Sequence, residues 1–120
     1  MSTDPGTLKD AATRRRREAL AQWQHIGAGA SACALAKSGV SCFPAAKLAE
    51  GRVAALGELL RALKKSGSDD PRDHLRETET LRDRWVAERD GGDAGRSRDW
   101  EAYRTGGAEE LEELAALFAV

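Results

Sequence analysis

Apolar side chains recur at three- and four-residue steps along most of the chain, the spacing of one face of an α-helix. The clearest stripe is Ala49, Val53, Leu56, Leu60 and Leu63, which predicts a helix over residues 44–65 with a coiled-coil-like seam. Weaker stripes predict helices over about residues 10–37, 71–90 and 108–119, and a short fifth helix over residues 97–104. The pattern therefore predicts an all-α fold.

Residues that favour helix starts support these boundaries. Thr7, Asp10 or Thr13 can cap the first helix, because each side chain can accept a hydrogen bond from a free backbone N–H. Asp70 followed by Pro71 is a typical opening for the third helix, with the acid at the cap and proline in the first turn.

Glycines favour helix ends, and several fall between the stripes. Gly91-Gly92 is expected to end the third helix, and Gly106-Gly107 to separate the short helix from the last one. Gly27 and Gly29 fall inside the first stripe. Either a neighbouring helix approaches closely there, which small residues permit, or the helix breaks.

Composition predicts a thin hydrophobic core. Leu, Ile, Val and Phe account for only 20 of the 120 residues, and no apolar stretch is long enough to span a membrane. The net charge of −1 argues against disorder. We expect a disordered terminus over residues 1–6 and one helical domain over residues 7–120, a bundle of four to five helices that association would complete. The expected core or interface residues are Trp23, Leu56, Leu60, Leu63, Trp85 and Leu114.

The near-zero net charge conceals two halves of opposite sign. Residues 1–66 contain 11 basic and 5 acidic side chains, whereas residues 67–120 contain 8 basic and 15 acidic ones. The basic half of the domain is thus residues 7–66 and the acidic half residues 67–120. The favoured interpretation is that the halves attract each other within one bundle. The alternative is that the basic half binds a polyanion.

Residues able to perform chemistry are few. His25, His74, Cys33 and Cys42 lack zinc-ligand spacing, so we expect no metal and no cofactor. The two cysteines fit small buried apolar residues, and a bridge between them needs both side chains to point inward.

No catalytic motif occurs, so we expect the protein not to be an enzyme. The arginines at residues 14–17 precede no apolar export region, and we expect a cytoplasmic protein.

One segment, residues 34–48, resembles a helix-turn-helix. Gly39 takes the place of the turn glycine, Val40 that of the apolar plug, and Ser41 would start the helix that enters the DNA major groove. Leu35 and Pro44 depart from the usual pattern. The resemblance implies a DNA-binding regulator. Its candidate nucleic-acid contacts are Arg14, Arg15, Arg16, Arg17, Lys37, Ser41 and Lys47.

A second segment, residues 25–31, resembles the phosphorylatable helix of histidine phosphotransfer domains. His25 would be the phosphorylated residue, and Gly29 and Ser31 occupy positions of small residues in that family. Ala28 stands where that family has a basic residue, which removes the group that assists phosphoryl transfer.

The function favoured by the sequence is that of a non-enzymatic helical adaptor, assembly or regulatory protein that binds a protein partner or itself as a homo-oligomer. The helical seam and the apolar face of the last helix supply the candidate interface: Val53, Leu56, Leu60, Leu63, Leu114, Leu117 and Phe118. The DNA-binding regulator is the alternative. A third hypothesis is an antitoxin or immunity-type protein whose acidic half blocks a basic partner.

Overall fold

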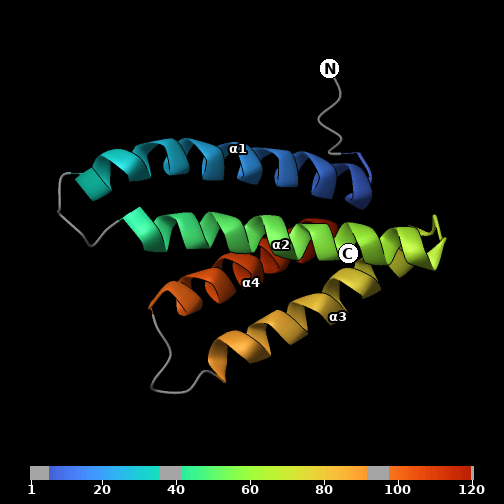
Figure 1. Cartoon of the computed structure of the whole chain (residues 1–120). Helices are drawn as coiled ribbons and strands as arrows, with labels where there is room; N and C mark the ends of the chain where they lie inside the picture. Colours follow the sequence, from blue (N-terminus) through green and yellow to red (C-terminus); the bar gives the residue numbers. More distant parts are fainter. Residues whose placement is uncertain (1–5, 36–41, 92–97, 120) are drawn as a thin grey trace.

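The computed structural model is an all-α bundle, as the apolar pattern predicts (Figure 1). Its helices are α1 (Leu8–Leu35), α2 (Cys42–Ser66), α3 (Pro71–Asp90) and α4 (Arg98–Phe118). The structure describes the backbone of residues 6–35, 42–91 and 98–119, and the side chains of residues 6–26, 45–91 and 100–119. The predicted end of the first helix at residue 37 lies outside the described residues.

Side-chain caps start α1 and α3 where the sequence predicts them. The Thr7 hydroxyl accepts a hydrogen bond from the Asp10 N–H at 3.1 Å, and the Asp10 carboxylate accepts one from the Thr7 N–H at 3.5 Å. This reciprocal pair satisfies two backbone donors that a helix start leaves free. At α3, the Asp70 carboxylate accepts from the Arg72 N–H at 2.9 Å, and Pro71 occupies the first turn.

Helix α2 lies at the centre of the bundle (Figure 1). It packs most extensively against α4 and then against α1, while α3 packs mainly against α4. Helices α1 and α2 run side by side in opposite directions. The molecule measures 50 × 38 × 24 Å. Its shortest dimension corresponds to about two helix diameters of roughly 10 Å each, so the core is one layer of side chains between two layers of helices.

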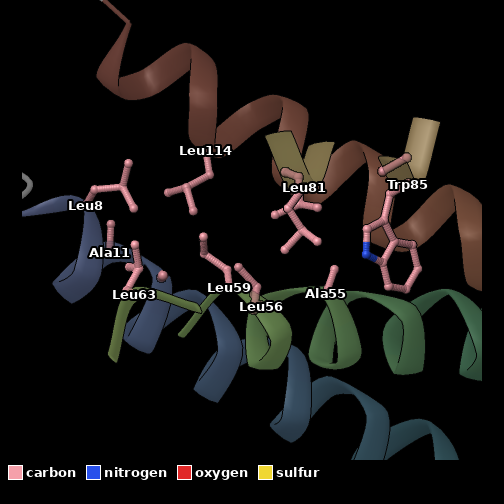
Figure 2. Close-up of a cluster of buried hydrophobic side chains, with 12 residues drawn as sticks. Leu8, Ala11, Ala55, Leu56, Leu59, Leu63, Leu81, Trp85 and Leu114 are labelled. Carbon is pink, nitrogen blue, oxygen red and sulfur yellow. The ribbon is translucent and has the colours of Figure 1, made fainter. Parts of the chain in front are cut away.

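All four helices contribute to this core (Figure 2). Most of the large residues come from α2, α3 and α4, and alanines fill the rest, which is how a chain poor in large apolar residues closes a core. Leu56, Leu63, Trp85 and Leu114 are buried as predicted, and Leu60 packs half-buried against them. The buried cluster comprises Leu8, Ala11, Ala12, Ala55, Leu56, Leu59, Leu63, Leu81, Trp85, Ala108, Leu111 and Leu114. Trp23 lies half-buried on α1, away from that cluster.

The predicted separation of residues 97–104 from residues 108–119 is wrong. Helix α4 is continuous from Arg98 to Phe118 and includes Gly106 and Gly107. The backbone of α1 likewise remains helical through Gly27 and Gly29, so the predicted alternative of a break there is also wrong. The side chains around those two glycines lie outside the described residues.

Three buried glycines allow close packing around α4. A Cβ atom at Gly51 would overlap the backbone carbonyl of Tyr103, and one at Gly106 would overlap the carbonyl of Leu48. A Cβ at Gly107 would overlap the indole ring of Trp85. Each glycine weakens its helix by about 1 kcal/mol relative to alanine. In return, Gly51 and Gly106 let α2 and α4 pack at backbone distance, and Gly107 makes room for the indole ring of Trp85. Gly106 and Gly107, which suggest a helix end in the sequence, are therefore part of a packing surface.

A Gly107→Ala substitution should destabilise the fold by about 2–3 kcal/mol, because the added methyl must displace the buried indole of Trp85. Chemical denaturation measures the free energy of unfolding. Gly57→Ala is the matched control, since its Cβ would meet only the Arg16 and Arg61 side chains at 3.4 and 3.5 Å. The control should be stabilised by up to about 1 kcal/mol through helix propensity. Equal effects of the two substitutions would contradict the packing role of Gly107.

Candidate functional site

Three helices bring a buried carboxylate and two guanidinium groups together. Glu110 on α4 is only 5% exposed. Arg15 on α1 donates from Nε to Glu110 Oε1 at 2.5 Å and from Nη2 to Glu110 Oε2 at 3.3 Å. Arg15 Nη2 also donates to Glu113 Oε2 at 2.5 Å. Arg52 on α2 places its Nε 4.0 Å from Glu110 Oε2. We call this arrangement the Glu110 cleft.

The Glu110 cleft is a polar hollow of about 180 Å³ between α1, α2 and α4. Its lining residues are Arg15, Glu18, Ala19, Gln22, Arg52, Glu110 and Glu113. Arg52 donates from Nη1 to Gln22 at 3.3 Å, while its buried Nε lacks a hydrogen-bond partner among the described residues. Six of the seven lining residues are therefore polar or charged, and Ala19 is the exception.

Charge pairing determines what the Glu110 cleft can do. A buried carboxylate is stable only when it is paired, and both arginines supply positive charge to Glu110. The hydrogen bond from Arg15 to Glu110 keeps the pKa of Arg15 above its ordinary value. A paired carboxylate and permanently protonated guanidinium groups are poorly suited to proton transfer. These ion pairs instead join the basic half of the chain to its acidic half. This agrees with the interpretation that the two halves attract each other within one bundle.

A second cluster surrounds Arg104 on α4. Its guanidinium carbon lies 4.9 Å from the ring centroid of Trp85, 4.4 Å from that of Trp100 and 5.5 Å from that of Tyr103. Arg104 also pairs with Glu88 of α3. Cation–π contacts and this ion pair attach the first turns of α4 to α3. Burial raises the pKa of Tyr103 above its ordinary value.

The candidate protein-interface residues do not form one surface. Val53, Leu56, Leu63 and Leu114 are buried against other helices of the same chain. Leu60 and Phe118 are half-buried, and Leu117 is 55% exposed. A coiled-coil-like seam marks a face that needs a partner helix, and here α1 and α4 of the same chain cover much of that face.

The candidate nucleic-acid contacts are also dispersed. Arg14 and Arg17 are exposed, whereas Arg15 is engaged in the Glu110 cleft and Arg16 lies half-buried beside α2. Lys47 pairs with Glu50 at 2.9 Å. The remaining candidates, Lys37 and Ser41, lie outside the described residues.

The helices flanking the helix-turn-helix-like segment form an antiparallel hairpin (Figure 1). A helix-turn-helix sets its two helices at about 90–120° to each other. The turn residues themselves, Gly39 and Val40, lie outside the described residues.

Residues with metal-binding or nucleophilic potential are not gathered. Among the described side chains, no group of three His, Cys, Asp or Glu residues is arranged to hold a metal ion. His74 is buried and donates from Nε2 to the Ser68 carbonyl at 2.5 Å, whereas His25 is exposed on α1. The side chains of Cys33 and Cys42 lie outside the described residues.

Within the described part of the chain, no helix has the length and apolar character needed to cross a membrane.

The Glu110 cleft is absent from the sequence-based predictions, although the sequence contains one signal for it. Glu110 lies four residues before Leu114 and next to Leu111, so it falls within the apolar stripe of α4 rather than on its polar face. A carboxylate in such a stripe requires a cation from another helix. The identity of that cation depends on tertiary structure, because four consecutive arginines at residues 14–17 face different directions around α1.

Comparisons of the chain with family models, with curated proteins and with solved structures find no match.

Glu110→Gln should destabilise the protein by about 2 kcal/mol, because it removes the charge that neutralises Arg15 and Arg52. Glu113→Gln is the matched control, since Glu113 binds the same arginine but its side chain is 59% exposed. The control should lose less than about 1 kcal/mol. Urea denaturation of both variants tests this, and losses of equal size would contradict a special role for the buried carboxylate.

Tyr103 should titrate above the ordinary tyrosine value of about 10 in the folded protein. It is the only tyrosine of the chain, so the ultraviolet absorbance of phenolate reports on it alone. Burial favours the protonated form, so this contribution to stability is present below about pH 10 and is lost as the pH rises through the folded-state pKa. Tyr103→Phe should abolish the signal. A midpoint identical in the native and denatured protein would contradict the prediction.

Proposed function

We propose that this protein is a non-enzymatic adaptor or assembly protein that binds an amphipathic helix of a protein partner along the last turns of α4. The observation that carries this proposal is an exposed apolar surface formed by Ala116, Leu117 and Ala119, which we call the α4 strip. Exposed leucines are ordinary when isolated, but Leu117 lines one hollow and the neighbouring Ala116 lines both that hollow and a second one.

The hollows lie on the two sides of the α4 strip. One, of about 410 Å³, is lined by Arg15, Glu113, Ala116 and Leu117. The other, of about 300 Å³, is lined by Glu79, Arg82, Glu112, Ala115, Ala116 and Ala119. Ala116 belongs to both. Alanines let a partner helix approach closely, and Leu117 provides a large side chain that such a helix can cover.

Charges around the α4 strip favour a basic partner. Three carboxylates and two guanidinium groups line the hollows. Glu113 is paired with Arg15 and Glu112 with Arg89, so the acidic charge comes mainly from Glu79 and from exposed Glu109 on α4. In a symmetric dimer formed through the strip, these acidic rims would face each other and repel. A partner helix with lysines or arginines beside its apolar stripe would instead complement the rim. The occupant that we propose is therefore a different protein rather than a second copy.

The two charged clusters around Glu110 and Arg104 support a binding role, because they stabilise the bundle that carries the α4 strip. Glu110 and Arg104 bond to neighbouring helices and stabilise the bundle. A bundle stiffened in this way presents the strip on a preformed helix, which reduces the entropy lost on binding.

The proposal can be tested by placing a photo-reactive phenylalanine analogue at Leu117 in the native host, with the same analogue at exposed Arg17 as the control. Crosslinking from position 117 should yield a peptide from another protein, in an amphipathic segment flanked by basic residues. A synthetic peptide of that segment should bind the purified protein.

Ala116→Arg should weaken binding of this peptide at least about tenfold, because it fills both hollows and repels the basic flank. Ala116→Ser is the matched control and should bind within about twofold of the wild type. Both variants should unfold at the wild-type midpoint, since residue 116 is exposed. Crosslinks only to a second copy of the chain, or crosslinks to no protein, would overturn the proposal.

A further inference from the structure

Gly57 on α2 differs from the three glycines of the α4 packing surface. It is buried, yet a Cβ at this position would meet no backbone atom. Its two contacts would be Nε of Arg16 at 3.4 Å and Nη1 of Arg61 at 3.5 Å. Helix packing therefore does not require glycine here, although glycine weakens the helix.

Arg16 and Arg61 converge over Gly57 from neighbouring helices. Helices α1 and α2 lie side by side (Figure 1). The Arg16 and Arg61 side chains both lie within 3.5 Å of the position that a Cβ of Gly57 would take. Among the described residues, neither guanidinium group forms an ion pair or a hydrogen bond with a carboxylate. Their neighbour Arg15, by contrast, binds two carboxylates. The fold thus brings two like charges together without an internal counter-ion in its described part.

We propose that Arg16 and Arg61 bind a phosphate group over Gly57. Each guanidinium group is a planar fork that donates two parallel hydrogen bonds to an oxyanion. A carboxylate has only two oxygens, so two forks that bind it must share them. A phosphate presents at least three oxygens and more negative charge, which suits two forks from different helices.

Glycine at position 57 places no side chain beneath the two arginines. A methyl group there would lie in ordinary contact with both, at 3.4 Å from Arg16 Nε and 3.5 Å from Arg61 Nη1, and we expect it to hinder a ligand that reaches between them. Exposed Arg14, Arg17 and Lys64 add positive potential on the same two helices, which raises the local concentration of anions. The site uses different residues from the α4 strip, so it stands independently of the proposed function.

Calorimetric titration of the purified full chain with inorganic phosphate tests the site, with chloride keeping the ionic strength constant. Arg16→Gln and Arg61→Gln should each weaken phosphate binding at least about tenfold. Arg17→Gln is the matched control, because it removes the same charge from an exposed position of α1, and it should change affinity less than about threefold. A parallel titration with glycerol phosphate shows whether the site accepts a phosphate ester or only the free anion.

Gly57→Ala separates binding from stability. It should raise the unfolding midpoint without phosphate, because alanine favours the helix, and it should also weaken phosphate binding. Such opposite changes are not expected of a glycine with a purely structural role. The proposal fails if phosphate binds no better than chloride, if Arg17→Gln weakens binding as much as Arg16→Gln, or if Gly57→Ala leaves phosphate affinity unchanged.

Discussion

The close approach of α2 and α4 is the contact on which the bundle depends. Gly51 and Gly106 let backbone atoms of the two helices meet, and Gly107 receives the indole ring of Trp85 from α3. Glycine weakens a helix, so this arrangement is stable only because close packing brings many atoms into dispersion contact. Large side chains are scarce in this chain, and backbone proximity replaces part of the burial that they would otherwise supply.

Apolar residues of α1 are buried in the core, and ion pairs add a link from α1 to α4. Few residues of α1 approach α4, and the main polar connection between them is Arg15 bound to Glu110 and Glu113. The carboxylate of Glu110 is buried where α4 passes α2. Its ion pair with Arg52 therefore lies next to the close contact that Gly51 makes with α4. The opposite charges of the two halves therefore become specific bonds between α1, α2 and α4. Arg16 and Arg61 form no ion pair among the described residues and converge over Gly57, and they provide the charge for the proposed phosphate site.

The fold class could be predicted from the sequence because helical periodicity is local. The α2 stripe and the caps at Thr7 and Asp70 involve residues within a few positions of one another, and the structure confirms them. The prediction of a helix break at Gly106-Gly107 is wrong because glycine is favoured both at helix ends and where two helices cross closely. Only the position of Leu48 and Trp85, distant in sequence, distinguishes the two cases.

The Glu110 cleft could not be predicted for the same reason, since its members are nearly a hundred residues apart along the chain. The candidate interface was an ambiguous prediction for a different reason. An apolar stripe such as Val53 to Leu63 specifies that a helix needs a partner, and it does not specify whether that partner belongs to the same chain.

Nuclear Overhauser spectroscopy of the folded chain tests the α2–α4 contact most directly, because glycine α-protons report backbone proximity without any substitution. The account predicts cross-peaks from Gly51 α-protons to the Gly107 amide proton and from Gly106 α-protons to the Leu48 α-proton. It also predicts an unbroken series of helical sequential cross-peaks through residues 106 and 107. A spectrum without the inter-helix peaks, and with the helical series interrupted at Gly106, would contradict it.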